Sequence, residues 1–211
     1  MDNGTRILVA DDHGIVRMGL VQIIKQLRPL AILSEVEDYK ALATLVSKES
    51  FDLVILDVNM PNGTLQQAID FIKIKQPELK ILIFSSQDES LYALRYLQMG
   101  AHGFLNKLSS KEQIDEALAA MLHKGRYISE EVRDSMVDRT LNKQQKSSPL
   151  QALSNRELEV ANKLVEGLTL KEMSNQLNLH SSTISTYKNR VFEKLEVTSV
   201  PELMEVLRMY S

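Results

Sequence analysis

The sequence lacks cysteine, long apolar runs and a strong excess of charge of either sign. The absence of cysteine excludes disulfide bonds and thiolate metal sites, and it fits a reducing compartment. The longest apolar stretches, such as LVIL and ILIF, are far too short to cross a bilayer. The first residues, MDNGTRILVADD, lack the basic region and long apolar run of a secretory signal. We therefore expect a cytoplasmic protein with no membrane partner.

The charge balance gives no support by itself for a nucleic-acid partner. The 25 Lys and Arg residues face 28 Asp and Glu residues, which leaves a net charge of −3. Residues 150–211 alone carry seven basic and eight acidic residues. Because nucleic-acid-binding domains are typically basic, this balance counts against such a function. The length of 211 residues and the 44% hydrophobic share predict two ordinary globular domains.

Residues 1–124 alternate short apolar runs with segments that have apolar residues at helical spacing. Near-continuous apolar runs of this kind are typical of parallel strands that are covered by helices on both faces. We expect an α/β domain with a doubly wound, five-stranded parallel sheet. The predicted strands are Ile7–Ala10, Ala31–Val36, Leu53–Leu56, Ile81–Phe84 and Gly103–Leu105.

The remaining sequence predicts a linker and an all-α domain. Residues 125–149 are polar, and we expect a partly helical linker that is loosest around Asn142–Pro149. From Leu150 onward, helix-start signals recur as capping boxes, in which the side chains of Ser or Thr and of Glu three positions later each bond the other's backbone N–H. The boxes are Ser154–Glu157, Thr169–Glu172 and Ser199–Glu202, and Gly167 is placed to end the first helix. We expect four helices, at about 154–166, 170–177, 182–195 and 199–209.

Polar residues follow four of the predicted strands. Asp11 and Asp12 follow the first strand, Asp57 the third, Ser85 the fourth and Lys107 the fifth. In an open parallel sheet, functional groups gather beyond the carboxyl ends of the strands, so these five side chains should share one edge.

The chemistry of this set is that of phosphoryl transfer assisted by a hard cation. Three crowded carboxylates repel one another unless a cation joins them, and oxygen ligands favour Mg²⁺. A carboxylate can act as a nucleophile, and Asp57 is the best placed of the three. Taken singly, an Asp after a strand is more often a cap or turn residue. His13 can ligate a metal, although a loop or cap role is more common for such a residue.

The first domain resembles the receiver domain of bacterial two-component response regulators, which has a flavodoxin-like fold. The resemblance is carried by LVADDH, VILDVNMP, IFSS and GAHGFLNK. It implies that Asp57 is the phosphoacceptor, and that Mg²⁺ is held by Asp11, Asp12, Asp57 and the backbone carbonyl of Asn59. It also implies that Ser85 and Lys107 read the phosphate and that Phe104 is an aromatic switch. From the pattern alone, Phe104 is equally a core residue of a short strand.

One loop departs from the family pattern. The family usually has Gly eight residues after the phosphoacceptor, whereas this sequence has Leu65 there and places its glycine at Gly63. We expect Thr64 to cap the helix that follows. The departure affects the shape of the loop beside Asp57, and with it the lifetime of a phosphoryl group.

The predicted helices at 170–177 and 182–195 have the spacing of a helix-turn-helix, whose second helix enters the major groove of DNA. Ile184, Val191 and Leu195 form an apolar stripe on the second helix. Its opposite face carries short hydroxyl, amide and basic side chains, which suit base edges and phosphates. A plain amphipathic helix with a solvated polar face has the same pattern.

The stretch LSNRELEVANKLVEGLTLKEMSNQLNLHSSTISTYKNRVFEKLEV, followed by PEL, resembles the LuxR-type DNA-binding domain, which we expect at residues 150–211. The whole chain therefore resembles a NarL/FixJ-type response regulator. By position, the resemblance implies base contacts from Ser185, Thr186 and Asn189. It implies contacts to the DNA backbone from Lys171, Thr183, Lys188 and Arg190. The last helix has more apolar residues than packing on three short helices needs, and the resemblance implies a dimer contact at Val200, Leu203, Met204 and Leu207. Core packing within the domain is the alternative for this helix.

The leading hypothesis is a transcription regulator in which a histidine kinase phosphorylates Asp57 and so controls dimerisation and sequence-specific binding to double-stranded DNA. The expected partners are the sensor histidine kinase, DNA, a second copy of the chain and RNA polymerase. The protein is not expected to be a dedicated enzyme. A phosphohydrolase is one alternative, although Asn59 stands where such enzymes often have a second acid. A DNA binder that works without phosphorylation is the other.

Overall fold

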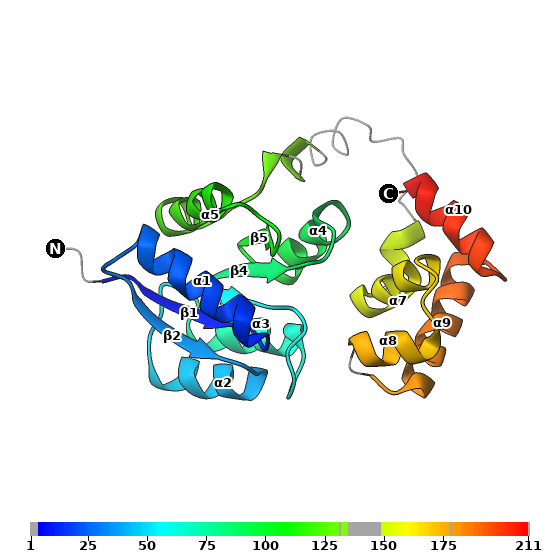
Figure 1. The fold of residues 1–211 in the computed structure, drawn as a ribbon, viewed down its shortest axis with the longest axis horizontal. Helices are drawn as coiled ribbons and strands as arrows, with labels where there is room; N and C mark the ends of the chain where they lie inside the picture. Colours follow the sequence, from blue (N-terminus) through cyan, green and yellow to red (C-terminus); the bar gives the residue numbers. More distant parts are fainter. Residues whose placement is uncertain (1–3, 131, 135–148, 178, 211) are drawn as a thin grey trace. The chain divides into compact units, whose positions relative to one another are not determined.

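A computed structural model of the protein describes residues 4–130, 132–134, 149–177 and 179–210. The chain divides into two compact units, Met1–Ser135 and Met136–Ser211. Figure 1 shows the first unit as a sheet between helices and the second as a group of helices. No helix in the described part of the chain is long and apolar enough to span a membrane.

The first unit confirms the predicted doubly wound parallel sheet. All neighbouring strands are parallel, and their order is β2-β1-β3-β4-β5. The strands are β1 (Arg6–Ala10), β2 (Ile32–Val36), β3 (Leu53–Leu56), β4 (Lys80–Ser85) and β5 (Gly103–Asn106). The helices between and after them are α1 (Gly14–Leu27), α2 (Tyr39–Lys48), α3 (Leu65–Lys75), α4 (Glu89–Met99) and α5 (Lys111–Lys124).

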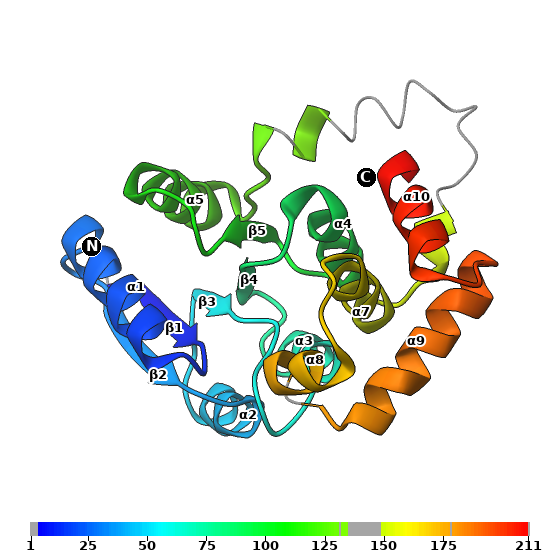
Figure 2. The ribbon, with the colours of Figure 1, turned by 45° about the vertical axis from the view of Figure 1, so that its right-hand side comes forward.

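Both faces of the sheet are buried, which explains why the strands are apolar without a break. On one face, Ile7 and Val9 of β1 pack in a core with Ile24 of α1 and Leu118 of α5. Leu8, between them in sequence, is buried on the opposite face. Figures 1 and 2 show α1 and α5 on one side of the sheet and α2, α3 and α4 on the other.

The first unit continues past the predicted boundary at residue 124. Tyr127 is buried, pairs with Gly103 of β5 in an isolated bridge, and donates its backbone N–H to the carbonyl of His102 at 3.1 Å. Val132 is also buried. These two apolar side chains anchor a stretch that the sequence analysis assigns to the linker. The predicted loosest part of the linker lies outside the described residues, apart from Pro149.

The second unit contains the four predicted helices, α7 (Asn155–Val165), α8 (Leu170–Leu177), α9 (Ser181–Leu195) and α10 (Val200–Tyr210), after a 3-10 turn η1 (Pro149–Ala152). Ser154 and Glu157 form the predicted capping box, with each side chain bonded to the other residue's backbone N–H. Thr169 and Glu172 do the same at the start of α8. These local signals fix where the helices begin.

The start of α10 differs from the predicted capping box. Ser199 Oγ accepts the backbone N–H of Glu202, as expected. The carboxylate of Glu202, however, bonds Thr198 instead of Ser199 and takes both the backbone N–H at 2.8 Å and the hydroxyl. The carboxylate of Glu202 therefore accepts two hydrogen bonds from Thr198, one from its backbone N–H and one from its hydroxyl, in place of the single backbone N–H of Ser199 that a capping box uses.

The prediction of a dimer contact on α10 is corrected for two of its four residues. Leu203 is 0% exposed and Leu207 is 5% exposed within their own unit, so they belong to its core. Val200 and Met204 are half-buried and keep part of their surface. The surplus of apolar residues on this helix is thus largely used by packing inside the unit.

Candidate functional site

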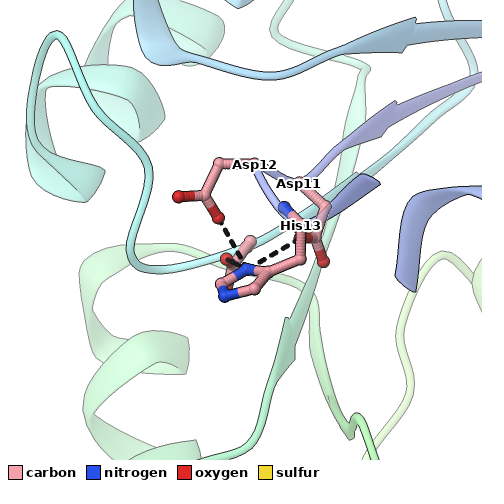
Figure 3. Close-up of side chains that lie close together, drawn as sticks. Asp11, Asp12 and His13 are labelled. Carbon is pink, nitrogen blue, oxygen red and sulfur yellow. Dashed lines mark hydrogen bonds and ion pairs between the residues drawn. The ribbon is translucent and has the colours of Figure 1, made fainter. Parts of the chain in front are cut away.

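The ends of β1 and β3 bring three carboxylates together. Asp11 and Asp12 follow β1, Asp57 follows β3, and these two strands are hydrogen-bonded neighbours. One ligand atom each from Asp11, Asp12, His13 and Asp57 lies within 4.8 Å of the others. Figure 3 shows His13 turned toward Asp12, with its Nδ1 2.7 Å from a carboxylate oxygen. The predicted gathering of Asp11, Asp12 and Asp57 at one edge is therefore present in the structure.

Lys107 joins this cluster from the end of β5. Its Nζ lies 2.8 Å from Oδ2 of Asp11 and 3.1 Å from Oδ2 of Asp57. The side chains of Asp11 and Asp57 are 2% and 4% exposed, and that of Lys107 is 13% exposed. The ammonium group therefore bridges two buried carboxylates that come from non-adjacent parts of the sequence.

Burial has the largest influence on the pKa of Asp57, the phosphoacceptor candidate. It raises the pKa of Asp57 above its ordinary value, because a buried carboxylate loses hydration. The Lys107 ammonium lowers this pKa, while the neighbouring Asp11 raises it again. Oδ1 of Asp57 accepts the backbone N–H of Val58 at 2.8 Å, so one oxygen is oriented by the chain itself.

The cluster fits a hard divalent cation. Its carboxylates offer oxygen ligands, and Oδ2 of Asp11 and of Asp57 are buried without a hydrogen-bond partner apart from the ion pair with Lys107. The side chain of Asp12 is 32% exposed, which leaves the cluster open to water on one side. One ammonium against three carboxylates leaves an excess of negative charge that a cation would offset.

The other predicted site residues of the first unit take defined places. Ser85 is buried at the end of β4, and its carbonyl accepts the backbone N–H of Lys107 at 2.9 Å. Phe104 is 1% exposed and stacks on Tyr96 with a centroid distance of 6.2 Å. Asn59 is half-buried in the loop after β3. Thr64 caps α3 as predicted, by accepting the backbone N–H of Gln67.

Sequence reasoning did not single out Tyr39, the first residue of α2. Its hydroxyl donates to the carbonyl of Val58 at 2.8 Å, directly beside the candidate phosphoacceptor. An aromatic residue at a helix start gives no sign of such a contact, because its partner lies 19 residues further along the chain. The contact is a property of the folded structure.

In the second unit, α9 presents a polar face away from its buried stripe. Ile184, Val191 and Leu195 are buried, as predicted. The predicted DNA-contact residues Thr186, Asn189 and Arg190 on α9 and Lys171 on α8 are exposed, and Thr183, Ser185 and Lys188 are partly exposed. The helix thus offers polar side chains to a partner while its apolar stripe stays in the core.

Two of these side chains already have partners within α9. The hydroxyl of Thr186 donates to the carbonyl of Ser182 at 3.0 Å, so this hydroxyl is left mainly as an acceptor. The Lys188 ammonium lies 5.3 Å from the centre of the Phe192 ring. Asn189 and Arg190 are exposed, whereas Lys188 is partly buried.

An ion pair between a half-exposed lysine and a buried glutamate joins α9 to α7. Lys194 Nζ lies 2.6 Å from Oε2 of Glu157, whose side chain is 4% exposed. Burial tends to raise the pKa of Glu157, but the hydrogen bonds from Lys194 and from the backbone of Ser154 outweigh it, so that the pKa is held below its ordinary value. The same carboxylate thus caps α7 and holds the exposed helix in place.

This ion pair gives the second unit a defined pH dependence. Because the pKa of Glu157 is lowered by folding, its contribution to stability is fully present above about pH 4.5 and is lost as the pH falls through the lowered value. At pH 7 we expect Glu157→Gln to lower the free energy of unfolding of this unit by about 1–2 kcal/mol. The difference from wild type should shrink toward pH 3, as followed by the loss of helical circular dichroism in urea. The exposed Glu166→Gln, at the opposite end of α7, is the control, and an equal effect of both variants would contradict the assignment.

Two family models match the chain. The model described as response regulator receiver domain matches residues 7–119, which is more than half of the chain. The model described as bacterial regulatory proteins, luxR family, matches residues 151–207. The acidic cluster and Lys107 lie within the first match, and α9 lies within the second.

Known proteins match this chain over nearly their whole length, through both family matches. The response regulator GacA of Pseudomonas aeruginosa is 29% identical over 199 residues, which cover 94% of this chain and 92% of GacA. RcsB of Salmonella enterica serovar Typhimurium, solved on the promoter rprA with the phosphomimetic BeF3−, is 27% identical, with a TM-score of 0.63 and coverage of 98% of this chain and 99% of that one. A structure of two RcsB dimers bound to two parallel DNAs is 26% identical, with a TM-score of 0.58 and coverage of 99% and 100%.

The fold, the strand-end cluster and both family matches agree. The first unit has the parallel sheet of a receiver, and the second has the helices of a LuxR-type domain. The chain belongs to the response regulators of the NarL/FixJ type, with a receiver domain followed by a LuxR-type DNA-binding domain.

Proposed function

We propose that this response regulator is switched by phosphorylation of Asp57, with a sensor histidine kinase as the phosphoryl donor. The observation that carries the proposal is the cluster of Asp11, Asp12 and Asp57 with Lys107 bridging two of the three carboxylates. Asp57 is the member that directly follows β3, the central strand of the five. It is therefore reached by groups from the strands on both sides.

The chemistry is a single phosphoryl transfer. A carboxylate oxygen of Asp57 attacks the phosphorus of the phosphohistidine, the P–N bond breaks, and the imidazole leaves with the electron pair. Asp11, Asp12, Asp57 and the backbone carbonyl of Asn59 would hold Mg²⁺, whose positive charge would offset the charge on the phosphoryl oxygens. Lys107 already lies 3.1 Å from Asp57 and supplies a second positive charge.

The phosphoryl group then has a direct route to neighbouring elements. Ser85 is placed to bond a phosphoryl oxygen, and its chain neighbour across the sheet is Asn106 of β5. Phe104 precedes Asn106 on that strand and packs against Tyr96 of α4. Phosphorylation would thus favour an altered packing of β5 and α4, which shifts the population of an active state.

The output is sequence-specific DNA binding by α9. Relatives named RcsB have been solved on DNA, and one such structure contains dimers. We propose the same partner for this chain, with two copies placing their α9 helices in successive major grooves. Pairing two copies also doubles a basic footprint that is weak in one. RNA polymerase is a further partner proposed for a promoter-bound regulator.

We propose that the protein is a regulator and not a dedicated enzyme. Two residues after Asp57 stands Asn59, whose amide cannot donate or take a proton as a general acid or base. Self-catalysed phosphorylation and slow loss of the phosphoryl group are compatible with the site. Steady turnover of small phosphate esters by the protein would favour a phosphohydrolase instead.

The test is the intact mass of the full chain after incubation with Mg²⁺ and acetyl phosphate. We expect wild type to gain the mass of one phosphoryl group, because its Asp57 is the nucleophile. Asp57→Ala should gain none. The exposed Asp70→Ala on α3 is the matched control and should be modified like wild type. An adduct on Asp57→Ala, or none on wild type with any donor, would contradict the proposal.

A further inference from the structure

The loop between β3 and α3 is held by the first residue of α2. Tyr39 is only 5% exposed, and its hydroxyl donates to the carbonyl of Val58 at 2.8 Å. The carbonyl of Asp57 lies 3.3 Å from the same hydroxyl. One side chain thus contacts two consecutive peptide groups that begin at the phosphoacceptor. The next carbonyl along the chain belongs to Asn59.

Two further contacts close the loop onto α2. The backbone N–H of Tyr39 donates to the carbonyl of Pro61 at 3.1 Å. The Asp38 carboxylate, which caps α2, accepts the side-chain amide of Asn62 at 2.9 Å. Asn62 itself has a positive φ of 63°, a conformation that Asn tolerates better than most residues.

The close approach of Tyr39 also accounts for the unusual position of the loop glycine. A Cβ at Gly63 would lie 2.8 Å from the Cβ of Tyr39 and 3.3 Å from its Cγ. These distances leave no room for a side chain at residue 63. Tyr39 and Gly63 therefore belong to one arrangement. In the family's usual loop the glycine stands at the position that Leu65 occupies in this chain, and here it stands two residues earlier, against Tyr39.

We propose that Tyr39 is a positioning residue for the phosphoacceptor loop. Its hydroxyl fixes the carbonyls of Asp57 and Val58, and through them the orientation of the Asn59 carbonyl toward the cation. The inference rests on the proposed function of Asp57 and adds a residue that acts through the loop. Without the hydroxyl, two carbonyls lose the donor they share, and the loop is free to turn toward other partners.

The test variant is Tyr39→Phe in the full chain, because it keeps the ring against Gly63 and removes only the hydroxyl. We expect the Kd for Mg²⁺ to rise about threefold to tenfold, the effect of losing one hydrogen bond. The Kd is measured from the amide NMR shifts of residues 57–63 during an Mg²⁺ titration. Phosphorylation by acetyl phosphate should slow by the same factor below the Kd and recover at saturating Mg²⁺.

The matched control is Tyr127→Phe. Tyr127 is another buried tyrosine of the same unit. It pairs with Gly103, the first residue of β5, at the amino ends of the strands, whereas Asp57 lies at their carboxyl ends. We expect it to bind Mg²⁺ as wild type does. Equal losses of Mg²⁺ affinity in both variants would show a general effect of stability and would overturn the proposal.

The outcomes also separate this inference from the proposed function. If wild type is phosphorylated and Tyr39→Phe binds Mg²⁺ with wild-type affinity, the positioning role is wrong and the function of Asp57 stands. If Tyr39→Phe lowers only the melting temperature, the role is structural and the inference is likewise overturned. If wild type takes no phosphoryl group at all, both proposals fail.

Discussion

Replacement of Lys107 by methionine is expected to destabilise the receiver unit by about 3–5 kcal/mol at neutral pH without divalent cations, because it leaves buried carboxylates without their cation. The ammonium lies within 3.1 Å of both Asp11 and Asp57, and both aspartates are almost fully buried. Burial and Asp11 already raise the pKa of Asp57, and without Lys107 it should rise further. The loss of stability should therefore be larger at pH 8 than at acidic pH, where protonation of Asp57 removes one of the unpaired charges.

Urea unfolding with and without Mg²⁺ measures this effect. We expect Mg²⁺ to restore much of the lost stability in Lys107→Met, because the cation takes the place of the missing charge between the carboxylates. Lys111→Met is the control, since Lys111 lies at the start of α5 and its ammonium contacts Gln26 at the surface. Wild-type stability of Lys107→Met in the absence of divalent cations would show that the ion pair does not hold the cluster.

Asn189→Ala is expected to cost about 2 kcal/mol of DNA-binding free energy per copy, or roughly a thousandfold in affinity for a dimer with two copies bound. Asn189 is exposed on the polar face of α9, and its amide can pair with a base edge. The loss of affinity should be confined to the preferred duplex. The substitution should also weaken the preference for one base at one position in each half-site. Fluorescence anisotropy with the duplex that wild type selects from a random library measures it.

Arg190→Ala provides the contrast within the same helix. If its guanidinium contacts a phosphate, the substitution should weaken binding to all duplexes alike and reduce the salt slope by about one per copy. Arg208→Ala removes the same charge from the exposed side of α10 and should leave the slope unchanged. An Asn189→Ala protein with unaltered base preference would show that this residue does not read DNA.

The strand-end cluster was predictable because short apolar runs identify the strands, and the parallel arrangement of the strands then places the residues that follow them. The runs Ile7–Ala10 and Leu53–Leu56 are apolar at every position, as strands buried on both faces require. Once these strands are placed as parallel neighbours, the residues that follow them must meet at one edge. Asp11 and Asp57 are therefore brought together by a rule that needs no knowledge of side-chain packing. The capping boxes at Ser154 and Thr169 were predictable for the same reason, since all their partners are local.

Other features depend on contacts that no local pattern contains. The number of apolar residues on α10 does not show which face of the helix packs against the rest of its unit. Leu203 and Leu207 lie on that face and are core residues. Tyr127 lies in a polar stretch, and only the folded sheet shows that it packs beside Gly103. The role of Tyr39 requires the start of α2 to be set against the loop after β3. These errors and omissions share one cause, which is tertiary packing.

The central claim is that a phosphoryl group on Asp57 controls DNA binding. The most direct measurement selects duplexes from a random library with the full chain, with and without acetyl phosphate and Mg²⁺, and compares wild type with Asp57→Ala. Intact mass and sizing of the same samples report the phosphoryl adduct and the oligomeric state. The account predicts that phosphorylated wild type forms dimers and enriches one two-fold symmetric sequence. Asp57→Ala should gain neither property from the donor. If wild type carries the adduct but binds DNA with the same affinity and preference as the untreated protein, the receiver does not control the output and the claim is wrong.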